Sequence, residues 1–261
     1  MRVGLITGGT SGIGLSFARA LAREGVDLVL VARDKGRLEA VAAELTAAHG
    51  VRVEVLDADL TDRADQARVA ERLRAGDVDT LVNNAGFSLK TPLVGGDDDL
   101  ADRAYEVMGR APRVLAGAAA AVMRERGEGW IINVASVSAL TRQDSYSALK
   151  AYALALTEVL ALELTNTGVH VTAVLPGWTR TEFHARGGSG RKGVPGFLWL
   201  DADRVAEVAL ADARAGHVIS IPSKRYKVAA AILQLLPNAA VRAVSRRIKG
   251  KAKTPVEGAT P

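Results

Sequence analysis

Seven short segments rich in Val, Ile and Leu recur along the chain, and segments of helical length separate them. Most are continuous apolar runs, which are typical of parallel strands that are covered on both faces. Three intervening segments, 15–25, 35–50 and 203–216, have helical composition and end in glycine, which commonly stops a helix. The pattern predicts a single α/β domain with a doubly wound, parallel sheet of about seven strands and helices on both faces. The strand segments are 2–7, 27–32, 51–56, 79–84, 130–136, 169–175 and 217–222.

The composition excludes several kinds of chemistry. The 261 residues are 48% apolar, which is enough for the core of one such domain. The chain has no cysteine, and its four histidines lack the spacing of metal ligands, so we expect no disulfide, no cysteine nucleophile and no metal site. No secretory signal precedes the first strand segment, and no apolar run approaches the roughly 18 residues of a membrane span. We therefore expect a cytoplasmic protein.

The net charge of +5 is a property of the C-terminal end. Nine of the 34 Lys and Arg residues lie between positions 224 and 253, where there is no acid, which leaves 25 against 29 acidic residues elsewhere. This distribution argues against nucleic-acid binding by residues 1–222, which we expect to form the folded domain. Residues 223–261 are predicted to be a basic helical tail with a disordered end. The tail could dock on the domain, cover a neighbouring subunit, or lie on the inner surface of an anionic membrane.

A glycine-rich turn, TGGTSGIG at 7–14, lies between the first strand segment and the first helix. Glycines allow a phosphate to approach the backbone closely, and the helix N-terminus supplies free N–H groups and a positive dipole end. The position of this turn in the sheet predicts dinucleotide binding. The residues expected to contact the cofactor here are Gly8, Thr10, Ser11, Gly12, Ile13 and Gly14.

The end of the second strand segment indicates which cofactor is bound. An acidic residue there would bind the ribose 2′-hydroxyl of NAD(H), but the sequence has Ala32 followed by Arg33, and a guanidinium suits a 2′-phosphate. Asp34 is interpreted as the N-cap of the next helix. NADP(H) is therefore favoured, and NAD(H) stays the alternative.

Tyr146 and Lys150 are four residues apart in SYSALKAYAL, so on a helix they share one face. A cation beside a phenol favours the phenolate and lowers the phenol pKa, which would make Tyr146 a proton donor near neutral pH. The alternative is an ordinary helix with a solvated lysine.

Together and in this order, these motifs resemble the short-chain dehydrogenase/reductase family over about residues 1–222. Further matching segments are DADL at 57–60, NNAG at 83–86, a serine after the fifth strand segment, and PGWTRT at 176–181. The resemblance implies a Rossmann-type, NADP(H)-dependent oxidoreductase that interconverts a carbonyl and a secondary alcohol. It also implies a homodimer or homotetramer formed through the helices before and after the fifth strand.

The resemblance assigns cofactor contacts to three further segments. Asp59 would bond the adenine amino group, NNAG would shape the end of the fourth strand, and the turn 176–181 would hold the nicotinamide carboxamide. The residues concerned are Asp59, Leu60, Asn84, Ala85, Gly86, Pro176, Gly177, Thr179 and Thr181.

The resemblance also assigns the catalytic roles. Tyr146 would exchange a proton with the substrate oxygen, Lys150 would lower the Tyr146 pKa and hold the nicotinamide ribose, and Ser136 would position the reacting oxygen. Ser138 is the other candidate serine, in a connection about three residues shorter than is usual in the family. Met108 stands where the family commonly has an asparagine, and Gly109 beside it would ease a helix kink through its backbone freedom.

Residues 182–200 are expected to form a lid over the substrate. Phe183, Phe197 and Trp199 could line an apolar pocket or merely pin the lid to the core. A hydrophobic ketone or 3-oxoacyl compound is favoured as the substrate. The alternatives are an NAD-dependent alcohol dehydrogenase of the same fold and an NADPH-binding regulator or scaffold without turnover.

Overall fold

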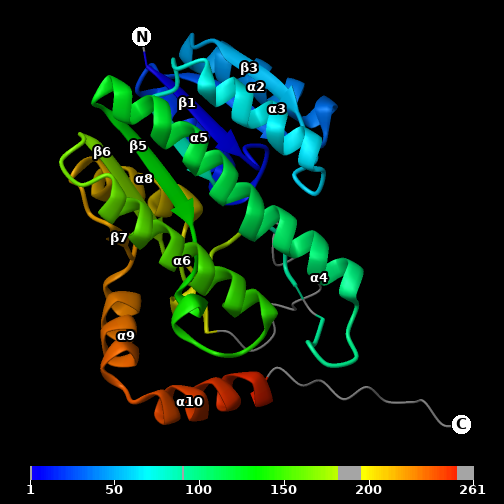
Figure 1. Ribbon diagram of the computed structural model, residues 1–261, viewed down its shortest axis with the longest axis vertical. Helices are drawn as coiled ribbons and strands as arrows, with labels where there is room; N and C mark the ends of the chain where they lie inside the picture. Colours follow the sequence, from blue (N-terminus) through cyan, green and yellow to red (C-terminus); the bar gives the residue numbers. More distant parts are fainter. Residues whose placement is uncertain (1, 90, 182–194, 252–261) are drawn as a thin grey trace, which may run out of the picture.

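A computed structural model describes residues 2–89, 91–181 and 195–251. Seven parallel strands form one sheet in the order β3-β2-β1-β4-β5-β6-β7 (Figure 1). The chain winds outward from β1 to β3 and then crosses back to β4 on the other side of β1, so the winding reverses between β1 and β4. The strands are β1 Val3–Thr7, β2 Asp27–Ala32, β3 Val53–Asp57, β4 Thr80–Asn83, β5 Gly129–Val134, β6 Val169–Val174 and β7 Ile219–Ser220.

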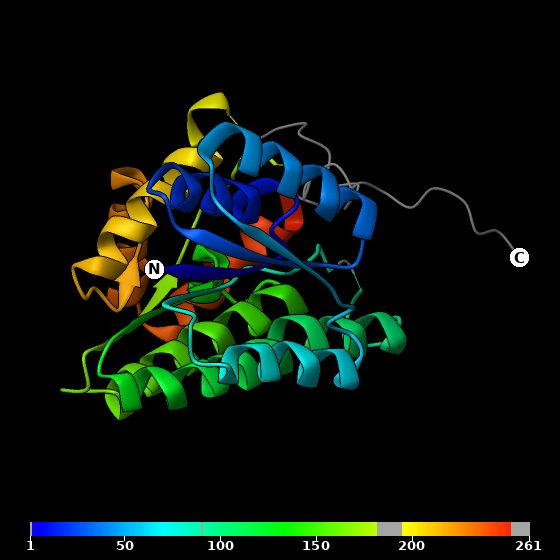
Figure 2. The ribbon, with the colours of Figure 1, turned by 90° about the horizontal axis from the view of Figure 1, so that it is seen from above.

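Helices cover both faces of the sheet (Figure 2). One core cluster lies between the sheet and helices α1, α2 and α8, and the other between the sheet and helices α3, α5 and α6. A π-helix, η1, joins α4 to α5, and a short 3₁₀ helix, η2, precedes α6. The helices are α1 Gly12–Arg23, α2 Lys35–His49, α3 Arg63–Arg74, α4 Asp98–Tyr105, η1 Glu106–Arg110, α5 Ala111–Arg126, η2 Val137–Leu140, α6 Ser145–Glu163, η3 Gly196–Leu198, α8 Ala202–Arg214, α9 Lys224–Leu235 and α10 Asn238–Lys251.

The strands have continuous apolar sequences because both sides of each strand are buried. In β1, Leu5 belongs to the cluster with α3 and α5, whereas the adjacent Ile6 belongs to the cluster with α1 and α2, and both are fully buried. Val29 and Leu30 of β2 divide in the same way. Since successive side chains point to opposite faces, a two-sided core needs apolar residues at every position. The predicted α/β fold, with one doubly wound sheet of seven strands, is confirmed.

Two local predictions can be compared with the structure. Asp34 is the N-cap of α2, where its Oδ1 accepts a hydrogen bond from the backbone N–H of Arg37 at 3.0 Å, as expected. The last strand is shorter than the predicted segment 217–222, because β7 is an edge strand that pairs with β6 through Ile219 and Ser220. Pro222, which has no N–H, cannot extend the hydrogen-bonded ladder.

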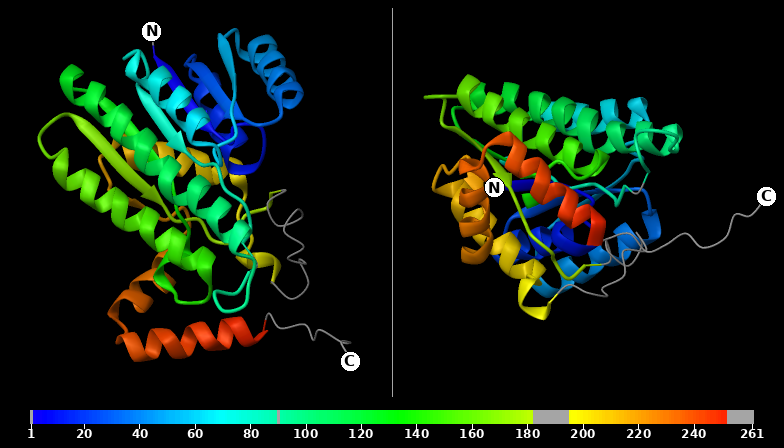
Figure 3. Two further views of the ribbon diagram at one scale, coloured as in Figure 1. Left: turned by 45° about the vertical axis from the view of Figure 1, so that its right-hand side comes forward. Right: turned by 90° about the horizontal axis from the view of Figure 1, so that it is seen from below.

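The C-terminal residues form two helices that lie beyond the carboxyl ends of the strands (Figures 1 and 3). Residues 253–261, for which disorder is predicted, and most of the expected lid at 182–200 fall outside the described residues. Within the ranges that the structure describes, no helix is both long and apolar enough to cross a membrane.

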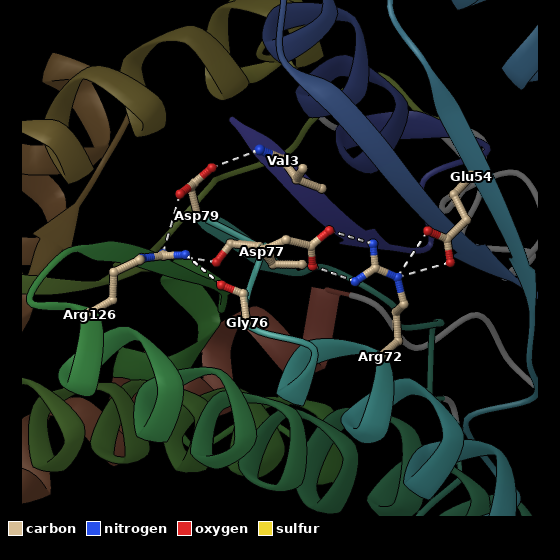
Figure 4. Close-up of polar contacts among 8 residues, drawn as sticks. Val3, Glu54, Arg72, Gly76, Asp77, Asp79 and Arg126 are labelled. Atoms are coloured by element: carbon tan, nitrogen blue, oxygen red, sulfur yellow. Dashed lines mark hydrogen bonds and ion pairs between the residues drawn. The ribbon is translucent and has the colours of Figure 1, made fainter. Parts of the chain in front are cut away.

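A network of charged residues connects neighbouring elements at the amino-terminal ends of the strands (Figure 4). Asp79, just before β4, accepts a hydrogen bond from the backbone N–H of Val3 at 2.8 Å and lies 3.3 Å from Nη2 of Arg126. Arg126 also donates to the carbonyls of Gly76 and Val78 at 3.0 Å. This network connects the start of β1 and the start of β4 to the end of α5.

A second arginine at this edge connects α3 to β3. Arg72 pairs with Glu54 at 2.9 Å and with Asp77 at 2.6 Å, and this hydrogen bonding holds the pKa of Asp77 below its usual range. These ion pairs lie near the amino-terminal ends of the strands, away from the carboxyl ends.

Replacing Asp79 by Asn should lower stability without impairing activity. The uncharged amide of the variant cannot form the ion pair with Arg126. Hydrogen bonds to charged groups contribute about 1.5–3 kcal/mol each. We expect the free energy of unfolding to fall by about 2 kcal/mol in denaturant titrations. The control is Asp102→Asn on the exposed side of α4, which should change stability by less than about 0.5 kcal/mol. Equal stabilities of the two variants would contradict this role of Asp79.

Candidate active site

The candidate residues meet at the carboxyl ends of β1, β4, β5 and β6, around the point where the strand order reverses. In open α/β sheets this crevice is where ligands bind. The glycine-rich turn follows β1, NNAG begins in β4, Ser136 follows β5, and the 176–181 turn follows β6.

The turn after β1 is compact, and a side chain would be strained or would clash at its glycine positions. Gly8 and Gly12 have positive φ angles of 67° and 53°. A Cβ on Gly14 would lie 2.2 Å from the carbonyl oxygen of Gly8 and 2.4 Å from Nδ2 of Asn84. Only glycine therefore fits at position 14, where α1 turns back onto the loop.

The start of α1 is a suitable cradle for a phosphate. Ser11 is the N-cap of α1, but its side chain makes no capping hydrogen bond, so the N–H groups of the first turn are not taken up by it. Thr10 is buried, and Ile13 lies in the first turn. The glycine-lined backbone and the positive helix end together fit a pyrophosphate.

Sequence reasoning missed the role of Thr7 in joining the glycine turn to NNAG. The Thr7 hydroxyl accepts hydrogen bonds from the backbone N–H groups of Asn84 and Ala85 at 3.0 and 3.1 Å. In turn, Nδ2 of Asn84 donates to the carbonyls of Thr7 and Gly8 at 3.0 and 3.2 Å. Asn84 thus holds the glycine turn in place through these two hydrogen bonds. The feature of the sequence that could have indicated this role is the threonine at the end of the first strand.

Arg33 and Asp59 face each other at the ends of β2 and β3. Nη1 of Arg33 lies 3.9 Å from Oδ2 of Asp59, and the two side chains are 64% and 40% exposed, so the guanidinium is accessible to a ligand. Oδ1 of Asp59 accepts hydrogen bonds from the backbone and the hydroxyl of Thr61, both at 2.9 Å. Leu60 is buried, so its side chain packs in the core.

The first turn of α6 is fixed by its cap. The Asp144 side chain accepts from the backbone N–H of Ser147 at 2.8 Å, and the Ser147 hydroxyl accepts from the backbone N–H of Asp144 at 3.1 Å. This reciprocal capping box starts α6 at Ser145 and places Tyr146 in its first turn.

The structure brings Ser136, Tyr146 and Lys150 together. Nζ of Lys150 lies 5.5 Å from the centroid of the Tyr146 ring and donates a hydrogen bond to the Val134 carbonyl, at the end of β5, at 2.8 Å. The Ser136 hydroxyl lies near enough to the Tyr146 phenol to lower its pKa, and it accepts a hydrogen bond from the backbone N–H of Ser138 at 3.1 Å. The hydroxyl of Ser138 is buried without a partner among the described residues. The serine beside the phenol is therefore Ser136.

The electrostatics of the pair differ from the expectation that Lys150 lowers the Tyr146 pKa. Burial raises the pKa of the Tyr146 phenol, the Asp144 carboxylate raises it further, and the hydrogen bond to Ser136 lowers it. Burial also lowers the pKa of the Lys150 ammonium to about 8. Removal from water disfavours both charged forms, and here it outweighs the attraction between them.

Lys150 has donors for a ligand. An ammonium has three N–H bonds, and the Val134 carbonyl takes one of them. The side chain is almost fully buried, so acceptors for the remaining donors would stabilise its charge. The hydroxyls of a nicotinamide ribose are acceptors of this kind, and the residues present therefore fit such a group.

A buried polar ladder that sequence reasoning missed sets α6 against the sheet. Nδ2 of Asn83 donates to Oδ1 of Asn133 at 2.9 Å, and Nδ2 of Asn133 donates to the Thr157 hydroxyl at 2.9 Å. Asn133 and Thr157 are essentially inaccessible to solvent. Thr157 is two helical turns after Lys150 on the same face, so the ladder supports the orientation of the lysine.

Met108 lies in the π-helix η1, where it is buried against the NNAG segment. A Cβ on Gly86 would lie 3.1 Å from Sδ of Met108. Gly109, expected to ease a helix kink, lies in this π-helix without a positive φ. Its missing Cβ instead leaves room for the Tyr105 ring, which would be 3.0 Å away, and for Leu149 of α6.

Polar side chains brace this π-helix from α3. Nε2 of the fully buried Gln66 donates to the Leu60 carbonyl at 2.8 Å and to the Glu106 carboxylate at 3.1 Å. Arg63 donates to the same carboxylate at 2.7 Å and holds the Glu106 pKa below its usual range. None of the sequence motifs indicated these contacts between α3 and the π-helix.

The 176–181 turn lies over the glycine turn and is paired with residues 196–200. A Cβ on Gly12 would lie 3.0 Å from Cβ of Thr181. Leu200 forms a bridge with the buried Thr179, donating to the Trp178 carbonyl at 2.7 Å and accepting from Arg180 at 3.0 Å. The Pro176 carbonyl accepts from the backbone N–H of Val137, in η2, at 3.1 Å.

The expected substrate residues are only partly described. Phe183 lies outside the described residues. The Trp199 ring packs at 5.6 Å from that of Trp178, and Phe197 is 62% exposed beneath the Arg225 guanidinium. Of the expected substrate residues, Trp199 therefore packs against the 176–181 turn.

Comparison with known proteins identifies the family. The model of the short chain dehydrogenase family matches residues 2–191, well over half of the chain. The chain belongs to the short-chain dehydrogenase family. An uncharacterized oxidoreductase of Staphylococcus saprophyticus is 35% identical over 185 residues, which cover 69% of this chain and 79% of the relative. The oxidoreductase class expected from the sequence is confirmed.

Solved structures of this family resemble the chain over nearly its full length. A short-chain dehydrogenase from Sphingobium yanoikuyae in complex with NADPH has a TM-score of 0.83 and 35% identity, covering 100% of this chain and 99% of its own. A bulky-bulky ketone specific alcohol dehydrogenase from Comamonas testosteroni has a TM-score of 0.77 and 32% identity, covering 92% and 96%.

Replacing the buried Lys150 by Met should not destabilise the protein at pH 7. The folded pKa of about 8 lies below the usual 10.5, so folding disfavours the ammonium. This penalty is fully present below about pH 8 and disappears as the pH rises past 10.5; at about 1.4 kcal/mol per pKa unit it amounts to roughly 3 kcal/mol. Loss of the hydrogen bond to Val134 offsets part of the gain.

The check compares free energies of unfolding of Lys150→Met and the wild type at pH 7 and pH 9.5. The stability of the variant relative to wild type should be higher at pH 7 than at pH 9.5. The control is Lys35→Met at an exposed position, whose difference from wild type should not change with pH. A relative stability of Lys150→Met that rises with pH would contradict the assignment of a costly buried ammonium.

Proposed function

We propose that this short-chain dehydrogenase is an NADP(H)-dependent oxidoreductase that interconverts a carbonyl and a secondary alcohol, with Tyr146 as the general acid/base. The observation that carries the proposal is the gathering of Ser136 and Tyr146 beside the buried Lys150, whose ammonium lies 5.5 Å from the centroid of the Tyr146 ring. A phenol, a hydroxyl and an ammonium at the reversal point of the sheet form a set of groups suited to proton exchange with a carbonyl oxygen.

Three groups of residues would hold the dinucleotide. The N-terminus of α1 would hold the pyrophosphate, and Lys150 would hold the nicotinamide ribose. Arg33, which is largely exposed beside Asp59, would hold the 2′-phosphate. The NADPH-bound relative from Sphingobium yanoikuyae supports the choice of NADP(H). NAD(H) stays the alternative cofactor, because Asp59 could also bind a hydroxyl.

The residues of the site would divide the work as follows. The bound nicotinamide supplies or accepts the hydride. In the direction of reduction, Ser136 donates a hydrogen bond to the substrate oxygen and Tyr146 donates a proton to it. Burial raises the Tyr146 pKa, so at neutral pH the phenol carries the proton that it donates in this direction. The positive charge of Lys150 stabilises the phenolate that remains after proton transfer.

We propose a hydrophobic ketone or 3-oxoacyl compound as the substrate. The packed rings of Trp178 and Trp199 at the 176–181 turn support an apolar pocket. The relative specific for bulky-bulky ketones, 32% identical, supports the same class. The alternative of a regulator without turnover draws on Met108, but the assembled Ser136, Tyr146 and Lys150 favour an enzyme.

Two surfaces support the proposed associations. Val159 and Leu162 of α6 are 51% and 76% exposed, and the homodimer or homotetramer expected from the family would bury them. Val228, Ile232 and Leu235 form an exposed apolar stripe on α9, which begins at the basic residue Lys224. This combination of apolar and basic side chains favours peripheral contact with an anionic membrane. The cytoplasmic location stays a prediction.

Tyr146→Phe should abolish most turnover and leave NADPH binding intact. Removing the proton donor is expected to lower kcat/KM by about 10²–10⁴-fold. The measurement is NADPH absorbance in a screen of hydrophobic ketones, with a separate NADPH titration for Kd. Tyr152→Phe on the same helix is the matched control and should retain activity. Normal turnover by Tyr146→Phe would eliminate the mechanism.

Arg33→Ala should change the cofactor preference. Without the guanidinium, Asp59 would repel a 2′-phosphate, so the Kd for NADPH is expected to rise by about 10–100-fold while the Kd for NADH changes little. Both constants are measured by fluorescence titration, with Arg204→Ala on α8 as the control. Equal affinity of the wild type for the two cofactors, unchanged in Arg33→Ala, would refute the assignment.

A further inference from the structure

Tyr226 of α9 is locked onto the 176–181 turn. Its hydroxyl accepts a hydrogen bond from the backbone N–H of Trp178 at 3.2 Å and donates one to the Leu198 carbonyl at 2.9 Å. The ring lies directly against Gly177, where a Cβ would come within 2.0 Å of the ring carbon Cζ. Burial raises the Tyr226 pKa, so the hydroxyl keeps the proton that it donates. Gly177 is thus needed for contact with α9.

Ser245 of α10 is locked onto the connection between β5 and α6. Its hydroxyl accepts a hydrogen bond from the backbone N–H of Arg142 at 2.9 Å and donates one to the Val241 carbonyl at 2.8 Å. Both Ser245 and Val241 are buried, whereas Arg242 and Arg246 on the same helix are exposed. Arg142 lies two residues before Asp144, whose side chain caps the helix that carries Tyr146.

The two contacts are on two segments that border the candidate site, which we call its walls. One wall is the connection 136–144, which contains Ser136 and leads to Tyr146. The other is the turn 176–181, expected to hold the nicotinamide carboxamide. The backbone hydrogen bond from Val137 to Pro176 joins the walls at their base, and α9 also packs against η2. The helices α9 and α10 lie one after the other beyond the strand ends (Figure 3), and each contacts one wall, through Tyr226 and Ser245 respectively.

We propose that α9 and α10 act as a strap that holds the two walls of the active site at a fixed separation, with Tyr226 and Ser245 as positioning residues. This inference rests on the proposed function of the site. The strap sets the distance between the proton donor on one wall and the nicotinamide on the other. Misplacement of reacting groups by about 1 Å can cost on the order of 100-fold in rate, so small movements of a wall would affect the hydride-transfer step.

The two hydroxyls each bind one specific backbone N–H, which allows a direct structural test. In Tyr226→Phe the ring stays against Gly177 but the acceptor for the Trp178 amide is lost, and in Ser245→Ala the acceptor for the Arg142 amide is lost. Residue-resolved amide hydrogen exchange should therefore become at least about tenfold faster at Trp178 in the first variant and at Arg142 in the second. Tyr105→Phe and Ser223→Ala are matched controls, because Tyr105 is half-exposed and the Ser223 side chain makes no capping hydrogen bond.

Kinetic constants separate a positioning role from a merely structural one. Tyr226→Phe should lower kcat by about tenfold while the Kd for NADPH rises less than threefold, because the contacts of the adenosine end are unchanged. Ser245→Ala should lower kcat/KM by about three- to tenfold, and the two controls should match the wild type.

The outcomes are distinct. Faster exchange at the named amides together with a lower kcat supports the strap. Unchanged exchange overturns it, and so does faster exchange with wild-type kinetics, because the walls would then be positioned without the tail. If the wild type neither binds NADPH nor reduces any ketone, the proposed function fails, and the exchange data alone then decide whether the tail holds the two walls.

Discussion

The contact between the Lys150 ammonium and the Val134 carbonyl is the interaction on which the site depends. A charge that is almost fully buried must be hydrogen-bonded, and the carboxyl end of β5 offers a carbonyl at 2.8 Å. This contact fixes the rotation of α6 relative to the sheet and places the Tyr146 ring beside the ammonium and its hydroxyl beside Ser136. The pKa of Lys150, lowered to about 8, measures how strongly burial disfavours this charge. A ligand that accepts hydrogen bonds from the ammonium would remove part of that penalty.

The rest of the site is held by buried polar contacts and by the absence of side chains. Thr7 and Asn84 join the glycine turn to NNAG, and the ladder from Asn83 through Asn133 to Thr157 joins β4 and β5 to α6. Each of these amide groups bonds at the point where two elements meet, so they fix distances that apolar packing alone would leave adjustable. Glycines 8, 12 and 14 let the backbone itself form the surface toward a ligand.

The C-terminal helices belong structurally to the site. The hydroxyl of Tyr226 satisfies the Trp178 N–H and the Leu198 carbonyl, and Ser245 satisfies the Arg142 N–H. In the sequence, this segment is distinguished by its positive charge. Of the alternatives considered for it, these buried contacts agree with docking on the domain. The basic residues Arg242 and Arg246 remain exposed on α10, so the charge faces outward while the docking uses small and hydroxyl-bearing side chains.

The sequence by itself determined the sheet, the glycine turn, the N-cap at Asp34, and the placement of Tyr146 and Lys150 on one helix face. These features are local. The apolar strand segments, the glycines that lack a Cβ atom, and the four-residue spacing of Tyr146 and Lys150 each depend on a few neighbouring residues. Tertiary structure alone decided that Gly109 and Gly177 make room for the rings of Tyr105 and Tyr226, and that desolvation governs the Tyr146 and Lys150 pKa values. Those outcomes depend on which distant segments meet and how completely they exclude water, and no short-range pattern contains that information.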